Sequence, residues 1–152
     1  MTWEAHRDPS ETTAFVDRTI AARNDGNGFV WTIRMGGALC GVVGLHDVLR
    51  TSRAWRMDRA ELGYWCGANV RNQGLVTEAA RAVIDYGFRE LQLHKVAVGC
   101  ASENLASKRV IEKLGFRFLG EQREHFFRFG QWWHHLAFEM TVGEWQSLTA
   151  AR

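Results

Sequence analysis

A polar loop at residues 71–77 has the composition of an anion-binding site. It reads Arg-Asn-Gln-Gly-Leu-Val-Thr and lies between a predicted strand and a strongly amphipathic predicted helix. The first N–H groups of a helix lack partners within it, and with the helix dipole they favour a phosphate. Gly74 lets a ligand approach the main chain, and Thr77 adds a hydroxyl donor. The segment lacks the pattern of a P-loop or a dinucleotide-binding turn, and an ordinary strand-to-helix connection is the alternative.

A second pair of polar side chains, Asn104 and Ser107, opens a helix shortly after a strand that ends at Cys100. Residues three positions apart share one face of a helix, so the amide and the hydroxyl are neighbours. Both residue types commonly cap a helix, which is one explanation for their presence. Together they could also hydrogen-bond the amides and the thiol of a ligand.

Capping and periodicity signals set the order of the elements that would position these groups. A first helix begins at Asp8 and Pro9, and its apolar stripe consists of Phe15, Val16, Thr19 and Ile20. Residues 47–58 are polar and rich in arginine, and they predict a loop. The other predicted strands lie at 29–35, 38–46, 60–66, 94–100, 116–127 and 132–141, with helices at 76–91, at 104–114 and after Thr141. This order favours an α+β fold in three layers, as a single domain over residues 1–152.

The composition is typical of a compact globular chain. Of 152 residues, 46% are hydrophobic and 24% charged, and the net charge is +2. This balance argues against strong attraction to nucleic acid or membrane, although Arg50, Arg53, Arg56 and Arg59 are clustered. No apolar run approaches the roughly 20 residues that cross a bilayer, and no secretion signal opens the chain. Three cysteines without a CxxC pair predict reduced thiols, no metal site and a cytoplasmic location.

Taken in order, the motifs resemble the GCN5-related N-acetyltransferase (GNAT) family. They are most similar to its ribosomal-protein N-terminal acetyltransferase branch. The matching segments are residues 60–65 (AELGYW), Arg71 with Gly74, residues 77–79 (TEA), residues 103–107 (ENLAS) and residues 114–116 (LGF). Each motif alone is common, whereas five of them in the same order and spacing are specific. The resemblance runs from residue 8 to residue 145.

The resemblance implies a mixed, mostly antiparallel sheet flanked by helices, in which two central parallel strands splay apart and admit acetyl-CoA. Here these strands are residues 60–66 and 94–100. The main chain of the first would pair with the pantetheine amides, and one of its N–H groups would polarise the thioester carbonyl. The implied acetyl-CoA contacts are Tyr64, Trp65 and Cys66 on this strand, Arg71, Asn72, Gln73, Gly74, Leu75, Val76 and Thr77 around the diphosphate, and Asn104 and Ser107 near the pantetheine arm and sulfur. No metal is implied.

The sequence departs from the family pattern at several positions. Val76 stands where the family usually has Gly or Ala. The alanine-terminus branch carries a Glu on the second wedge strand and a Tyr in the following helix, where this chain has Gly99 and Ile111. The ribosomal-protein branch can place a Glu on the strand after the LGF motif, and the nearest equivalent here is Phe126, with Glu121 and Glu124 close by. Because only residues 1–8 precede the first helix, the N-terminal strand of the family's sheet is expected to be missing.

An acceptor amine must lose a proton before it attacks a thioester, since its pKa is about 8 for an α-amine and about 10.4 for lysine. Glu61, on the strand that borders the wedge, is the first candidate for this base, and its alternative is a salt bridge with Arg56 or Arg59. Ser107 is positioned to donate a proton to the leaving thiolate. The further candidates for the base are Glu124, His125, His134 and His135.

The sequence therefore predicts an acetyl-CoA-dependent N-acetyltransferase that acts on a primary amine. A protein N-terminus is the first choice of acceptor, and a small molecule such as a polyamine is nearly equal. A non-catalytic acyl-CoA-binding regulatory module is the alternative from another class. Trp132 and Trp133 are adjacent on one predicted strand and must face opposite sides, so one is expected to meet the cleft or a second copy in a homodimer.

Overall fold

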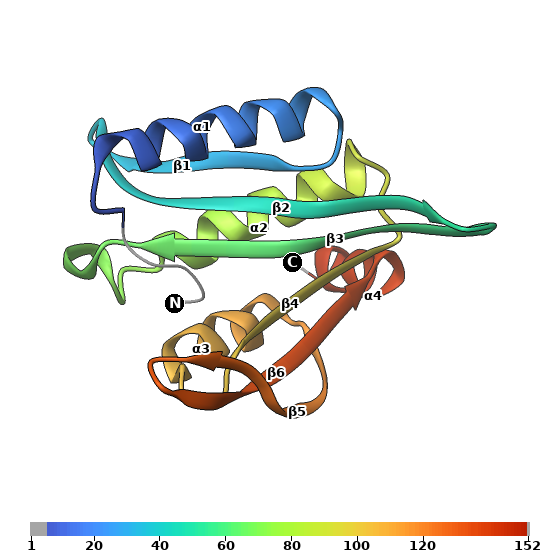
Figure 1. Ribbon diagram of the computed structural model, residues 1–152. Coiled ribbons are helices and arrows are strands. Elements are labelled where there is room, and N and C mark those ends of the chain that lie inside the picture. The colour runs from blue at the N-terminus through green and yellow to red at the C-terminus, as the bar shows by residue number, and fades with distance from the viewer. Residues whose placement is uncertain (1–5, 152) are drawn as a thin grey trace.

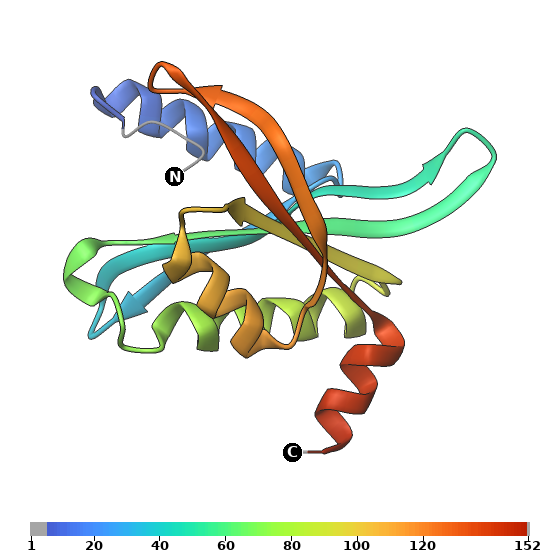
Figure 2. The ribbon, with the colours of Figure 1, turned by 90° about the horizontal axis from the view of Figure 1, so that it is seen from below.

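The computed structural model describes residues 6–151, which form a six-stranded sheet with helices on both faces (Figure 1). The strand order is β1-β2-β3-β4-β6-β5, and only the β3–β4 pair is parallel within these residues. In the second view α1 lies on one side of the sheet, and α2 and α3 lie on the other (Figure 2). The elements are α1 (Pro9–Asn24), β1 (Phe29–Met35), β2 (Ala38–Ser52), β3 (Trp55–Cys66), the 3₁₀ turn η1 (Ala68–Val70), α2 (Leu75–Arg89), β4 (Lys95–Ala101), α3 (Leu105–Leu114), β5 (Arg117–Arg128), β6 (Gln131–Thr141) and α4 (Val142–Ala150).

Local sequence signals set where the helices begin and end. The carboxylate of Asp8 accepts a hydrogen bond from the N–H of Ser10 at the start of α1. Thr141 and Glu144 form a reciprocal capping box at the start of α4, in which each side chain accepts from the other residue's N–H. Gly115 ends α3 in the left-handed conformation, with φ of 89°. These predicted helix boundaries are confirmed.

The apolar stripe predicted for α1 is only half correct. Phe15 and Thr19 are half-buried, whereas Val16 and Ile20 are 45% and 53% exposed. Successive residues of a helix are turned by 100°, so the residue after each inward position points away from the sheet. Helix α1 therefore contacts the sheet along one narrow line. Among the described residues, no helix is long and apolar enough to cross a bilayer.

The loop predicted at residues 47–58 is wrong, because β2 and β3 continue through it as a two-stranded arm that extends beyond the rest of the sheet (Figures 1 and 2). Thr51 pairs with Arg56, and the chain reverses at Arg53, whose φ is 56°. The buried carboxylate of Asp58 accepts hydrogen bonds from Arg50 and Arg56, and the Arg56 guanidinium holds the pKa of that carboxyl below its ordinary value. Because most side chains between residues 47 and 58 are exposed, the segment lacks the alternation of apolar residues that identifies a strand.

The parallel strands β3 and β4 separate soon after they meet. They pair at Arg59–Lys95, Ala60–Val96 and Glu61–Ala97, and no later pair joins them within the described residues. Strand β3 continues to Cys66 alongside β2, while β4 continues to Ala101 alongside β6. The splay that the family resemblance implied is thus present, and it begins directly after Glu61.

Helix α2 packs across one face of the sheet and contacts strands on both sides of the point where β3 and β4 separate. Its apolar residues recur at helical spacing, and Ala80, Ile84 and Phe88 are buried. They share a core with Leu45 of β2 and Val96 of β4, both of which are fully buried. The predicted helix is confirmed, and its N-terminus lies at the end of the sheet where β3 and β4 diverge (Figure 1).

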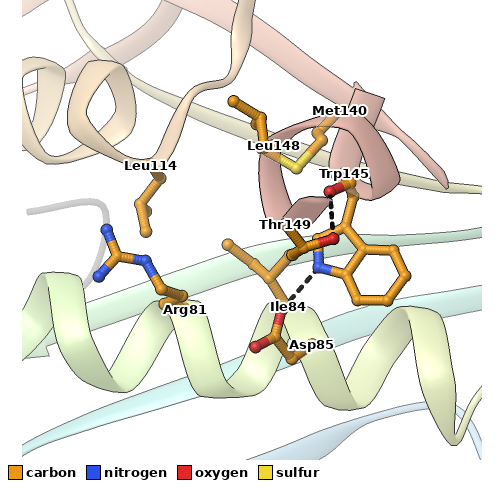
Figure 3. Close-up of a pocket in the computed structure, with 8 residues that line it drawn as sticks. All are labelled: Arg81, Ile84, Asp85, Leu114, Met140, Trp145, Leu148 and Thr149. Carbon is orange, nitrogen blue, oxygen red and sulfur yellow. Dashed lines mark hydrogen bonds between the residues drawn. The ribbon is translucent and has the colours of Figure 1, made fainter. Parts of the chain in front are cut away.

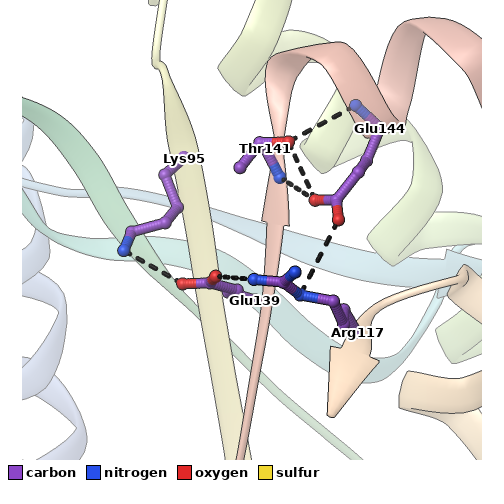
Figure 4. A network of polar contacts seen from close by, with 5 residues as sticks. All are labelled: Lys95, Arg117, Glu139, Thr141 and Glu144. Carbon is purple, nitrogen blue, oxygen red and sulfur yellow. Dashed lines mark hydrogen bonds and ion pairs between the residues drawn. The ribbon is translucent and has the colours of Figure 1, made fainter. Parts of the chain in front are cut away.

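A polar network fixes the opposite, closed end of the β3–β4 pair (Figure 4). The carboxylate of Glu139 on β6 accepts from Lys95 Nζ on β4 at 3.0 Å and from an Arg117 guanidinium nitrogen on β5 at 2.9 Å. Arg117 Nε also lies 3.9 Å from Glu144, which caps α4. Hydrogen bonds from Lys95, and then from Arg117, lower the pKa of Glu139. The network therefore joins three strands and a helix through one carboxylate.

Glu139→Gln is expected to lower the melting temperature at pH 7 by about 2–4 °C, the shift that loss of about 1 kcal/mol produces in a chain of this size. Because the pKa of Glu139 is lowered in the folded state, its stabilisation is present above the unfolded pKa of about 4.3 and disappears as the pH falls through the lowered value. Thermal melts of both proteins between pH 3 and pH 7 test this. Equal melting temperatures at pH 7, or a difference that grows toward acid, would contradict it.

Candidate functional site

The separation of β3 and β4 creates the first part of the candidate site. On its other edge β3 stays paired with β2, through Gly41–Cys66 and Val43–Tyr64 among other pairs. On the β4 side, strand pairing ends at Glu61. An extended ligand with amide groups can add to such an edge as a further strand. The main chain predicted to contact acetyl-CoA, at Tyr64, Trp65 and Cys66, lies on this diverging segment and is half-buried.

The loop from Arg71 to Gly74 leads into the N-terminus of α2 beside the same segment. Gly74 has φ of +80° and makes no side-chain cap, and a Cβ placed on it would meet no atom within 4 Å. The first intrahelical bond runs from the N–H of Glu78 to the carbonyl of Gly74, so the N–H groups before Glu78 lie ahead of the helical ladder. Arg71 through Gly74 are exposed. This geometry suits an anionic group such as a diphosphate.

The predicted pair Asn104 and Ser107 is joined by the side chain of Tyr64, a residue that was predicted to contact acetyl-CoA only through its main chain. The N–H of Ser107 donates to Asn104 Oδ1 at 3.1 Å, so the capping role is confirmed. The hydroxyls of Ser107 and Tyr64 lie 2.9 Å apart, and Tyr64 also donates to the Ser107 carbonyl at 3.3 Å. Burial raises the pKa of Tyr64 to about 12, so its phenol keeps its proton at neutral pH. No local spacing could have linked two residues that are 43 positions apart.

Cys100 lies behind this hydroxyl pair on β4 and is 4% exposed. Burial raises the pKa of its thiol, against the lowering effect of a hydrogen bond with Ser107. The thiol therefore behaves mainly as a small apolar group in the core. The polar end of the site is formed by Tyr64, Ser107 and Asn104.

The candidates for the base lie on three different strands, β3, β5 and β6. Glu61 is exposed, occupies the last parallel pair, and is in register with His46 on β2. It makes no salt bridge with the described residues, and Arg56, one of the partners considered for it, binds Asp58 instead. Glu124 is exposed and lies in an irregular part of β5 with φ of 50°.

The histidine candidates fall on two faces of β6. His135 is half-buried, and its ring stacks on that of His125 with centroids 4.8 Å apart and an interplanar angle of 21°. His134 faces the other way, and its Nδ1 is buried without a hydrogen-bond partner among the described residues. The two adjacent tryptophans also divide as predicted, since Trp132 is 56% exposed while Trp133 is half-buried and donates to the Arg128 carbonyl.

A small pocket between α2, α3, β6 and α4 lies apart from the wedge (Figure 3). Its volume of about 10 Å³ is close to the space of a single water molecule. Trp145 donates to Asp85 at 2.6 Å across it, which ties α4 to α2. The pocket is therefore a packing gap, lined by Arg81, Ile84, Asp85, Leu114, Met140, Trp145, Leu148 and Thr149.

A family model described as an acetyltransferase (GNAT) domain matches residues 1–117. The "Putative ribosomal N-acetyltransferase YdaF" of Bacillus subtilis is 33% identical over 80% of this chain and 64% of its own length. The spermidine N(1)-acetyltransferase of Escherichia coli K12 is 31% identical over 67% of this chain and 52% of its own length.

A solved structure, Mycobacterium smegmatis RimJ in complex with CoA-disulfide, has the same fold with a TM-score of 0.84. It is 24% identical, and the match covers 99% of this chain and 74% of that one. The chain spans about half to two thirds of the length of the curated relatives it matches. The relatives thus share a fold and a family, and they differ in the acceptors that their names give.

Proposed function

Because the chain belongs to the GNAT acetyltransferase family, we propose that it transfers an acetyl group from acetyl-CoA to a primary amine. The single observation that carries the proposal is the splay of β3 and β4 directly after Glu61, beside the N-terminus of α2. Reduced thiols at Cys40, Cys66 and Cys100 suit the cytoplasm, which is the location we propose.

Acetyl-CoA would bind along the diverging segment of β3. Its pantetheine amides would pair with the main chain of Tyr64, Trp65 and Cys66, and its diphosphate would accept from the N–H groups between Asn72 and Thr77. The side chain of Asn104 keeps its amide donor for the arm, since only its oxygen is used in capping. A β3 N–H that points into the wedge would stabilise the developing negative charge on the thioester oxygen.

The hydroxyl pair would assist departure of the CoA thiolate. A thiolate with an ordinary pKa near 8.5 needs only modest help. Ser107 would donate its proton, and the protonated Tyr64 beside it would replace that proton at 2.9 Å. On the other face, the carboxylate of Glu61 would attract the positively charged acceptor toward the wedge.

A protein N-terminal α-amine is the acceptor we propose. The "Putative ribosomal N-acetyltransferase YdaF" matches 80% of this chain at 33% identity, whereas the spermidine acetyltransferase matches 67% at 31%. An α-amine, with a pKa of about 8, is also easier to deprotonate than a polyamine nitrogen with a pKa near that of lysine. A polyamine is the competing acceptor.

The test is calorimetric titration with acetyl-CoA, followed by a thiol-release assay against peptides with free N-termini and a set of polyamines. Binding with turnover of peptides supports the proposal in full. Turnover of polyamines alone would show that the acceptor is a polyamine and would leave the proposed acetyl transfer intact. Binding without turnover would favour a regulatory acyl-CoA-binding module, and absence of binding would refute the proposed site.

Ser107→Ala is expected to lower kcat by about 10-fold without abolishing turnover, because proximity and carbonyl polarisation supply most of the acceleration. The affinity for acetyl-CoA should change little, since the Ser107 N–H that Asn104 caps is retained. Ser147→Ala is the matched control, because Ser147 is exposed on α4 and bonds only the Gly143 carbonyl within the described residues. An unchanged kcat in Ser107→Ala would contradict the proposal that Ser107 donates a proton to the leaving thiolate.

A further inference from the structure

The imidazole of His135 occupies the space of a side chain that β4 lacks. His135 lies opposite Ala101 in the β4–β6 pair, so its side chain shares a face with Ala101 and with Gly99, two residues earlier. A Cβ placed on Gly99 would lie 2.1 Å from His135 Nε2 and 2.4 Å from Cε1. The ring can therefore lie over Gly99 only because this position is glycine. Gly99 belongs to the part of β4 that has already separated from β3.

A hydrogen bond sets which ring nitrogen carries the proton. His135 Nδ1 lies 3.1 Å from the carbonyl oxygen of the Gln122 side chain on β5. A carbonyl oxygen only accepts, so Nδ1 carries the hydrogen and Nε2 has the lone pair. The nitrogen over Gly99 is thus the basic one. Gln122 and His135 are direct partners in the β5–β6 register, which holds the ring in this orientation.

The surroundings of His135 keep its ring neutral. Burial lowers its pKa below the ordinary value, and the stacked His125 on β5 lowers it further. Among the described residues, Gln122 on β5 and the uncharged Gly99 and Ala101 on β4 also lie beside the ring. The base form therefore dominates at pH 7.

We propose that His135 Nε2 is the base that takes a proton from the acceptor amine, an assignment that rests on the acetyl transfer proposed above. Cys100 and Gly99 are consecutive in β4, so their side-chain positions face opposite sides of the strand. The hydroxyl pair of Ser107 and Tyr64 lies on the Cys100 side and His135 lies on the Gly99 side. Acid and base thus flank the splayed strand from its two faces.

The proton and electron balance of the step is complete. Nε2 removes one proton from the ammonium form of the acceptor, and the freed electron pair forms the C–N bond with the thioester carbonyl carbon. The C–S bond then breaks with its electrons on sulfur, and the thiolate gains a proton from Ser107. The nitrogen loses a second proton, which restores the hydroxyl pair, and the imidazolium releases its proton to water. The products are the amide, the CoA thiol and one proton.

The experiment compares His135→Gln with His94→Gln in the full chain. Glutamine keeps a polar side chain of similar size and cannot take up a proton near neutral pH. His94 is exposed at the other end of β4 and serves as the control for the same exchange. We expect kcat of His135→Gln to fall about 100-fold, with the amine KM and the calorimetric acetyl-CoA affinity changed by less than about threefold and the melting temperature retained.

The pH profile separates a base from a merely structural residue. In the wild type, kcat should rise as the pH increases through the pKa of His135, and this limb should be absent from His135→Gln. His125→Gln removes the neighbouring charge and should move the limb to higher pH, because the pKa of His135 then returns toward its ordinary value. A wild-type profile in His135→Gln would overturn the assignment while leaving the transferase proposal intact. Absence of turnover in the wild type with every amine would overturn both.

Discussion

Gly74→Asp should weaken acetyl-CoA binding by roughly 100-fold at low salt, which corresponds to about 2.7 kcal/mol. The position is the last residue before α2, and its N–H and those that follow would hold the diphosphate. Aspartate tolerates the left-handed backbone that Gly74 adopts at φ of +80°, and a Cβ there meets no atom within 4 Å. The fold should therefore accept the substitution. The affinity for acetyl-CoA should fall instead, because a carboxylate placed beside the diphosphate repels it.

Comparison with Gly74→Asn separates the effect of the aspartate's charge from the effect of its size. Asparagine has nearly the same size and also tolerates a left-handed backbone, so it should weaken binding by less than about 10-fold. The gap between the two variants should narrow as ionic strength rises, because salt screens exposed charges. Calorimetric titration of both variants at two salt concentrations measures this. Equal affinities for Gly74→Asp and Gly74→Asn would mean that no anion binds at the N-terminus of α2.

Gly99→Ala should lower kcat about 100-fold, because the new methyl group would displace His135 from β4. A Cβ at this position would lie 2.1 Å from His135 Nε2 and 2.9 Å from the Leu136 carbonyl, so both the ring and the adjacent main chain must shift. Overpacking of this kind costs typically about 1–3 kcal/mol of stability. Binding of acetyl-CoA should persist, since the diphosphate loop lies on another part of the chain.

A double variant distinguishes this clash from general damage. Adding His135→Ala to Gly99→Ala removes the ring that the methyl group meets, so part of the lost stability should return while kcat remains low. Gly143→Ala is the control, because a Cβ at Gly143 meets no atom within 4 Å. Urea denaturation and steady-state kinetics give the two readouts. Additive stability losses, or recovery of kcat in the double variant, would show that His135 and Gly99 act independently.

The sequence predicts those features whose causes are local. The periodicity of α2, the capping box of Thr141 and Glu144, and the left-handed end of α3 at Gly115 all arise within a few residues, and the structure confirms them. The arm of β2 and β3 has no such signal, because most of its side chains are exposed and leave no apolar alternation. The family resemblance, and not the residue pattern, indicates where β3 and β4 part.

The sequence predicts several single residues of the candidate site, but it does not predict the contacts between them. Helix-start signals identify Asn104 and Ser107, but the contact of Ser107 with Tyr64 depends on how α3 packs beneath β3. In the sequence, Gly99 only stands where a related branch has a carboxylate, and His135 is one of several candidate bases. The register of β4 with β6 shows that the ring of His135 covers Gly99. Long-range register of this kind is not encoded in any short segment.

The brief contact between β3 and β4 makes the sheet two half-sheets joined at a hinge. One half comprises β1, β2 and β3, the other comprises β4, β6 and β5, and only three residue pairs connect them within the described part of the chain. The carboxylate of Glu139 pins the second half at the hinge end, while α2 spans both halves below. In the proposed function acetyl-CoA would insert beyond the hinge as an additional strand. Bound acetyl-CoA would then connect the two half-sheets along the wedge, and we expect the sheet to unfold as one cooperative unit only when it is bound.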